Sequence, residues 1–138
     1  MKTIKEILKD CHTVAVVGLS SNPEKASHRV AAYLKSSGYK VIPVNPKEKE
    51  ALGEKAYSDL SSIPEKVDVV DIFRRSEDVL PTVEEAIRIG AGAVWMQLGV
   101  VSQEAADKAE EAGLAVVMDA CMMREHMDLC DQGELPRT

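Results

Sequence analysis

Polar residues that could do chemistry gather directly after a short apolar run near the start of the chain. Ser20, Ser21 and Asn22 follow the run Val14–Val17 and Gly18, and they precede a stretch with helical spacing of apolar residues. A loop between a buried strand and a helix N-terminus presents unpaired backbone N–H groups and the positive end of a helix dipole, which suits a phosphate. The loop lacks the G-x-G-x-x-G spacing of dinucleotide sites, so an ordinary connection is the alternative.

A second group of candidate residues follows the next apolar run. Asn45, Pro46 and Lys47 stand where a nicotinamide dinucleotide site normally carries a carboxylate for the ribose hydroxyls. A lysine at this place attracts an additional phosphate, which favours a nucleotide with a phosphorylated ribose, such as coenzyme A or NADP. The ends of the expected strands together carry three cations and one carboxylate: Lys47, Arg74, Arg75 and Asp119. A local excess of positive charge favours a phosphorylated ligand.

These residues need a scaffold, and the order of apolar runs predicts one. Helical segments that end at Gly38, Gly90 and Gly113 are each followed by a short apolar run. This alternation predicts an α/β fold, a Rossmann-like doubly wound five-stranded parallel sheet with helices on both faces. The expected strands are 14–17, 41–44, 67–73, 93–98 and 115–118. Ligands of such sheets bind beyond the carboxyl ends of the strands.

Length and composition predict one domain. The 138 residues form a single unit, with a capping helix over 1–11 and a polar tail over 131–138. The net charge of −6 and the lack of a basic run argue against a nucleic-acid partner. The first residues lack the apolar core of a signal peptide, and we find no spanning segment, so we expect a cytoplasmic protein without membrane contact.

Three segments in order resemble the small stand-alone CoA-binding domain family, which is similar to the N-terminal domain of the succinyl-CoA synthetase α subunit. They are VAVVGLSSNPEKASHRVAAYLKSSGYKVIPVNPK, VDVVDIFRRSEDVLPTVEEAI, and GAGAVWMQLGVVSQEAADKAEEAGLAVVMD with CMMREH. The resemblance runs from about residue 7 to residue 126. It implies a Rossmann-like domain that binds coenzyme A or an acyl-CoA across the strand ends.

The resemblance also implies which residues contact the ligand. The loop 20–22 matches the family's phosphate loop, Lys47 the lysine after the second strand, and 97–99 the turn near the pantetheine arm. Phe73 and Arg74 match the edge expected beside the adenine or pyrophosphate. His28, in the next helix, could touch a phosphate or cap local structure. The full set of expected contacts is Gly18, Ser20, Ser21, Asn22, Lys25, His28, Val44, Asn45, Pro46, Lys47, Phe73, Arg74, Gln97, Leu98 and Gly99.

The chain departs from the synthetases in ways that argue against ligase chemistry. It has no room for the second domain that carries their phosphorylated histidine, and Ala120 stands where the family usually has arginine. We find no Ser/His/Asp set and no paired carboxylates at a shared strand end, and we expect Asp71 to be hydrogen-bonded structure. The prediction is therefore a non-catalytic CoA-binding protein, with a protein partner or a homodimer left open.

Two alternatives concern redox chemistry. An NADP-dependent oxidoreductase or redox sensor shares the phosphate argument. Cys11, Cys121 and Cys130 are expected to be free thiols, and Cys121 could form a mixed disulfide with the thiol of CoA. Cys121, His126 and Cys130 have poor spacing for zinc, so we expect no metal.

Overall fold

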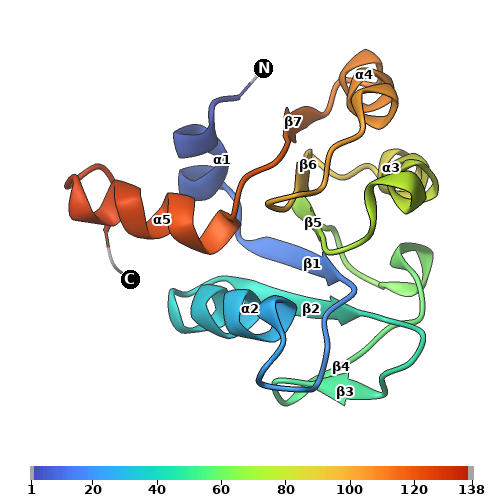
Figure 1. The fold of residues 1–138 in the computed structure, drawn as a ribbon, viewed down its shortest axis with the longest axis horizontal. Helices are drawn as coiled ribbons and strands as arrows, with labels where there is room; N and C mark the ends of the chain where they lie inside the picture. Colours follow the sequence, from blue (N-terminus) through green and yellow to red (C-terminus); the bar gives the residue numbers. More distant parts are fainter. Residues whose placement is uncertain (1, 137–138) are drawn as a thin grey trace.

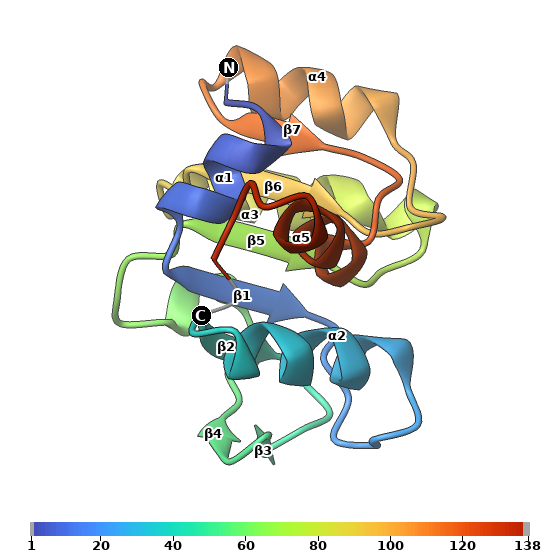
Figure 2. The same ribbon diagram turned by 90° about the vertical axis from the view of Figure 1, so that its left-hand side faces the viewer.

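The computed structural model describes residues 2–136, which form a five-stranded parallel sheet in the order β2-β1-β5-β6-β7. Its strands are β1 (Thr13–Val17), β2 (Lys40–Val44), β5 (Val69–Ile72), β6 (Ala93–Met96) and β7 (Ala115–Val117). Figure 2 shows them stacked from β7 to β2. The predicted Rossmann-like fold is confirmed. Because β1 pairs with both β2 and β5, the strand order reverses at β1, and ligands bind at such a switch point.

Five helices cover the two faces of the sheet. The helices α1 (Ile4–Asp10), α2 (Ala26–Ser36) and α5 (Met122–Asp131) pack on one face, and α3 (Val79–Arg88) and α4 (Gln103–Glu111) pack on the other (Figure 1). Alternation along β1 produces two cores, because successive side chains point to opposite faces. Each face of the sheet is therefore buried, as expected for parallel strands.

The connection between β2 and β5 contains structure that the sequence analysis missed. Residues 48–66, which lie between two of the predicted strands, hold the antiparallel pair β3 (Glu50–Ala51) and β4 (Glu54–Lys55). A short helical turn, η1 (Leu60–Ser62), follows, with Asp59 Oδ1 accepting from Ser62 N at 2.8 Å. A second short turn, η2 (Ser76–Asp78), leads into α3. Strands of two residues are too short to show an alternating pattern.

Other predicted element ends agree with the structure to within a few residues. Ser102 caps α4, since its Oγ accepts from Ala105 N at 3.2 Å. Pro81 lies in the first turn of α3, where its missing N–H costs nothing. Among residues 2–136, no helix is long and apolar enough to cross a membrane.

Candidate functional site

The switch point is a tight backbone crossing at the ends of three strands. Gly18 N donates to Val44 O at 2.8 Å, and Phe73 N donates to Val17 O at 2.9 Å. Gly18 has a φ of +89°, and a Cβ at this position would lie 2.4 Å from Phe73 O. Only glycine fits here, so the chain leaves β1 in one fixed direction toward the loop that precedes α2.

The β1–α2 loop, residues 18–25, is closed by the protein's own side chains. Ser20 N donates to Ser27 Oγ at 3.1 Å, Ser21 N to Glu48 Oε2 at 2.8 Å, and Asn22 N to Ser20 Oγ at 3.0 Å. The prediction of unpaired N–H groups was therefore wrong for these three residues. The hydrogen bond from Ser21 N holds the pKa of Glu48 below its ordinary value. The carboxylate of Glu48 thus accepts from the Ser21 N–H, which we expected to face a phosphate.

His28 and Asn45 hold this loop in place. His28 Nδ1 lies 3.0 Å from Ser20 O. Asn45 Nδ2 donates to Leu19 O at 3.1 Å, and Asn45 Oδ1 accepts from Lys47 N at 3.0 Å. The side chain of Lys47 is exposed, and within residues 2–136 it has no ion pair or hydrogen bond. His28 and Asn45, both predicted ligand contacts, therefore position the loop. The side chain of Lys47 is available to bind an anion.

The other predicted contacts near β1 and β2 differ in accessibility. Lys25 is the N-cap residue of α2 and is exposed, and Pro46 is exposed after β2. Val44 is only 2% exposed, so its side chain belongs to the core. A ligand above β2 can reach the first two side chains but not the third.

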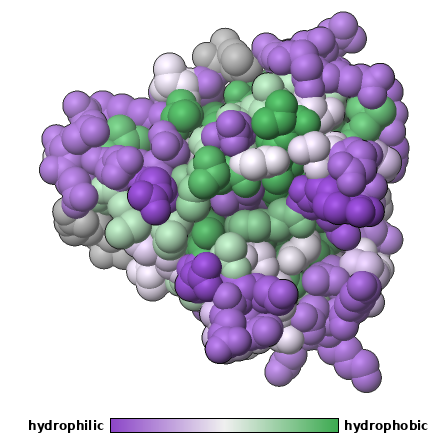
Figure 3. Space-filling model, in the orientation of Figure 1, coloured by the Kyte–Doolittle hydropathy of each residue, from purple (hydrophilic) through white to green (hydrophobic). Residues whose placement is uncertain are grey.

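A cavity of about 590 Å³ opens at the ends of β5 and β6, beside the first turns of α2 and α5. We call it the arginine cavity. Four of the predicted contacts line it: Phe73, Arg74, Gln97 and Leu98. The remaining wall comes from Ala26, Arg29, Val30, Arg75, Val100, Cys121, Met123 and Arg124. Figure 3 shows apolar surface in the middle of this face, ringed by polar side chains.

Arg29 and Arg124 are functional candidates that the sequence analysis missed. Arg29 is the fourth residue of α2, and Arg124 is the third residue of α5. In a parallel sheet, the helix after each strand starts at the carboxyl edge, so its first turn lies near the ligand site. Their positions close to the predicted helix starts could therefore have identified both arginines as candidate ligand contacts.

Hydrogen bonds between neighbouring turns hold the rim of the cavity. Gly99, a predicted contact, donates from N to Asp119 Oδ1 at 2.7 Å, and Asp119 has a positive φ of 58°. Trp95 Nε1 donates to Ala120 O at 2.9 Å. Ser76 Oγ accepts from Val101 N at 2.9 Å. The turns after β5, β6 and β7 are thus connected, which preorganises the rim.

A buried carboxyl group lies beneath this edge. Asp71 on β5 is in register with Val16 and Trp95, two residues before Phe73. It is 0% exposed, and neither oxygen has a hydrogen-bond partner in the described part of the chain. The prediction that Asp71 is hydrogen-bonded was wrong. Burial raises the pKa of Asp71 well above its ordinary value, because a charged carboxylate loses its hydration there.

The cysteines and His126 are spread over different places. Cys121 lies in the cavity wall, whereas Cys130 Sγ is 3.7 Å from His126 Nδ1 inside the α2/α5 core. Tyr33 OH lies 2.7 Å from the same nitrogen. Burial raises the pKa of Cys11 to about 12, which makes it a poor nucleophile. Over residues 2–136, no group of three His, Cys, Asp or Glu side chains could hold a metal ion.

Comparison with known proteins identifies relatives over most of the chain. Residues 12–127 match the model of a family described as "CoA binding domain". The uncharacterized protein YneT of Bacillus subtilis (strain 168) is 44% identical over 123 residues, covering 89% of this chain and 91% of that protein. The α subunit of acetate–CoA ligase [ADP-forming] II of Pyrococcus furiosus is 34% identical over 113 residues, covering 80% of this chain but 25% of the subunit.

Solved structures agree in fold. A hypothetical protein from Pyrococcus horikoshii OT3 is 46% identical with a TM-score of 0.90, and the match covers 92% of this chain and 89% of that one. A Thermus thermophilus protein is 35% identical with a TM-score of 0.88, covering 93% and 99% of the two chains. The resemblance inferred from the sequence motifs is confirmed: this chain belongs to the CoA binding domain family.

Proposed function

We propose that this protein binds coenzyme A or an acyl-CoA across the carboxyl ends of its strands and does not itself catalyse a reaction. The observation that carries the proposal is the arrangement of the edge. Lys47, whose side chain has no partner among residues 2–136, follows β2 where a dinucleotide site would need a carboxylate, and the arginine cavity opens two strands away. Membership of the CoA binding domain family supports the same ligand.

The residues at this edge fit the parts of coenzyme A. Lys47 and the β1–α2 loop would hold the phosphorylated nucleotide, once the carboxylate of Glu48 leaves Ser21 N. The arginine cavity has mostly apolar walls and could take the pantetheine arm, with Gln97 as a polar contact. Pockets of about 300–1,000 Å³ are typical of small-molecule sites.

The absence of a nucleophile–base pair from the described wall of the cavity supports a binding role. Cys121 is the nucleophile there, and no histidine or carboxylate is among the lining residues. Nucleophilic catalysis needs a base within hydrogen-bond reach or a strongly lowered pKa. We infer that the protein carries, stores or presents the ligand.

Thermal unfolding with coenzyme A, dephospho-CoA, NAD and NADPH tests this proposal. A ligand that binds only the folded state at a hundred times its Kd adds about 2.7 kcal/mol of stability. We expect coenzyme A to raise the Tm, dephospho-CoA to raise it less, and NAD to leave it unchanged. A shift with NADPH and none with millimolar coenzyme A would replace the proposal by the oxidoreductase alternative.

Lys47→Met sharpens the test. Loss of this lysine should weaken coenzyme A about tenfold, which is the effect of about one charge-assisted hydrogen bond. Lys49→Met is the matched control, because Lys49 is also an exposed lysine, two residues further on. Isothermal titration calorimetry should show normal affinity for the control. Equal losses of affinity in the two variants would mean that coenzyme A responds to the overall positive charge of this segment and not to a specific contact with Lys47.

A further inference from the structure

The arginine cavity has an unusual set of charges. Four of the six arginines in the sequence line it, but none of the eleven lysines and no acidic residue does. This concentration occurs in a protein with a net charge of −6. The guanidinium group presents a rigid planar fork of donors that matches a carboxylate or a phosphate, whereas lysine acts as a point charge. The cavity is therefore suited to a planar or polyvalent anion.

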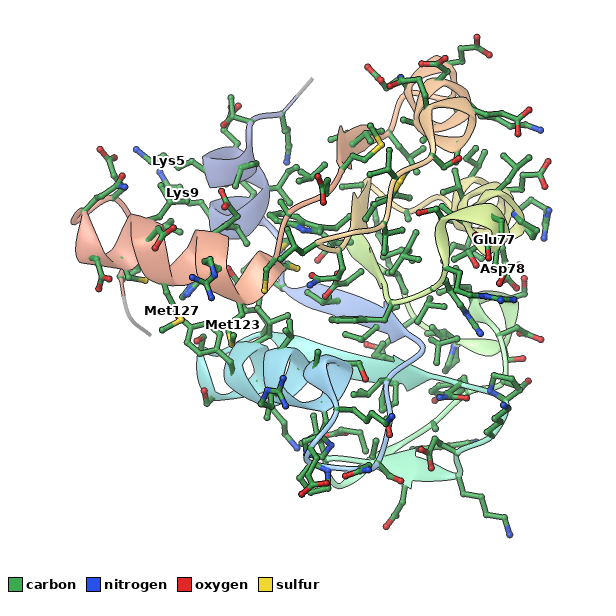
Figure 4. All side chains as sticks on the ribbon, viewed as in Figure 1. Lys5, Lys9, Glu77, Asp78, Met123 and Met127 are labelled. Atoms are coloured by element: carbon green, nitrogen blue, oxygen red, sulfur yellow. The ribbon has the colours of Figure 1, made fainter. Side chains whose placement is uncertain are left out.

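Two of the four arginines have no partner in the described part of the protein. Arg75 Nε lies 3.4 Å from Glu77 Oε1 and 3.1 Å from Asp78 Oδ2, and Figure 4 shows both acids at the start of α3. Arg29 Nη1 donates to a backbone carbonyl at 2.5 Å. The side chains of Arg74 and Arg124 have no hydrogen bond or ion pair with any residue between 2 and 136. They reach the cavity from the turn after β5 and from the first turn of α5.

Gln97 supplies a polar group in the same wall. Its side chain is 4% exposed, and its Oε1 accepts from Met122 N at 3.1 Å. Because a backbone N–H can only donate, this bond fixes which end of the amide is oxygen. The Nε2 then has no acceptor in the described chain, so it can donate to a carbonyl of a ligand in the cavity. A thioester or amide carbonyl has the required chemistry.

The position of the cavity along the sheet edge indicates which part of the ligand it receives. Lys47 follows β2 at the sheet edge, and β5 and β6 lie two and three strands away, roughly 10–15 Å at about 4.8 Å per strand. A coenzyme A molecule with its nucleotide at Lys47, as proposed above, extends its thiol end toward β5 and β6. Arg74 and Arg124 therefore lie beyond the nucleotide, near the acyl group.

We propose that the acyl group carried in this cavity ends in a carboxylate, so that the protein selects CoA thioesters of small dicarboxylic acids through Arg74 and Arg124. This inference rests on the proposed function. A terminal carboxylate entering mostly apolar walls needs paired cations, and two are present. An acyl group with a terminal methyl would instead desolvate both guanidinium groups without pairing them, which costs affinity.

Calorimetry with succinyl-CoA and butyryl-CoA tests the inference, because these thioesters have four-carbon acyl groups that differ in a terminal carboxylate or methyl. We expect succinyl-CoA to bind on the order of tenfold tighter. Arg124→Met and Arg74→Met should each reduce this ratio severalfold, and in Arg124→Met the affinity for free coenzyme A should stay within about twofold. Both residues are exposed, so the variants should fold, and circular dichroism checks this.

Controls separate this inference from the proposed function. Arg88→Met, in the last turn of α3 outside the cavity, should keep the full ratio. Arg124→Lys keeps the charge but loses the planar fork, and it should keep only part of the ratio. Equal binding of the two thioesters would overturn the inference and leave coenzyme A binding intact. A variant that weakens free coenzyme A as much as succinyl-CoA would assign the arginines to the nucleotide phosphates and overturn it too. If no CoA compound binds, the proposed function itself fails.

Discussion

The two ends of the candidate site differ in whether their polar groups already have hydrogen-bond partners within the protein. In the β1–α2 loop, the backbone donors of Ser20, Ser21 and Asn22 are all paired with side chains of the protein. In the arginine cavity, Arg74 and Arg124 have no partner within residues 2–136. A ligand must replace existing hydrogen bonds at the first end and adds new ones at the second. The gain in binding free energy per contact should therefore be larger in the cavity.

Gly18 lies against Phe73 between the two ends of the site, and a substitution there should have the largest effect on stability. Gly18→Ala puts a Cβ 2.4 Å from Phe73 O at a residue with φ +89°, so β1 and β5 must move apart. We expect a loss of about 2–4 kcal/mol in the free energy of unfolding, measured by urea denaturation.

A second glycine isolates the steric contribution. Gly38 has a φ of +102°, but a Cβ added to it would meet nothing within 4 Å among the described residues. Gly38→Ala should cost only about 1 kcal/mol, from backbone strain alone. Similar losses in both variants would show that the close approach at Gly18 does not join the two ends of the site.

Asp71→Val tests the cost of the buried carboxyl group beneath the cavity, and it should have the next largest effect on stability. The pKa of Asp71 is raised by burial in the folded state, so its unfavourable contribution is absent below the unfolded pKa, near 3.8. Stability is then lost as the pH rises from that value toward the folded pKa. Replacing this buried carboxyl should raise the free energy of unfolding by about 1–3 kcal/mol at pH 7 and by less at pH 4.

Asp68 is the matched control with the opposite sign. Partial burial opposes ionisation, but hydrogen bonds from His12 N and Thr13 N, at 2.9 and 3.0 Å, lower the pKa of Asp68 overall. Its contribution is present above the unfolded pKa and is lost as the pH falls through the folded pKa. Asp68→Asn should therefore destabilise at pH 7 and have less effect in acid. A stabilising Asp68→Asn would contradict this assignment.

Glu48→Gln addresses the closed end and should have the smallest effect. The carboxylate of Glu48 accepts from Ser21 N at 2.8 Å, and a phosphate at this donor must displace it. Glutamine keeps an acceptor but removes the charge, so it competes less well with an anion. We expect coenzyme A to bind about two- to fivefold tighter by calorimetry. Glu50→Gln, on β3 and exposed, is the control; weaker binding in Glu48→Gln would mean that Glu48 assists the ligand.

The fold could be predicted because its signals are local. Each of the five strands is a short apolar run after a turn, and Gly38, Gly90 and Gly113 end the helices that precede three of them. The β3–β4 pair could not be predicted, because two-residue strands of charged and small residues carry no periodic signal.

The site was predicted only in part because its decisive contacts are long-range. Glu48 closes a loop 27 positions earlier in the chain, and nothing near Ser21 indicates this. Asp71 lacks a partner in the described chain because Val16 and Trp95 flank it in the sheet, and only the register shows that. Arg29 and Arg124, by contrast, could have been found from helix starts alone. Which side chains face one cavity depends on strand order, which the sequence analysis did not assign.

Trp95 gives the protein an intrinsic fluorescence probe. The indole is fully buried, it is the single tryptophan of the chain, and its N–H holds the carbonyl of Ala120 just before α5. Any occupant that displaces the start of α5 must stretch or break that bond and alter the polarity around the ring. Emission wavelength and intensity should therefore follow the seating of a ligand in real time, without a dye or an added label.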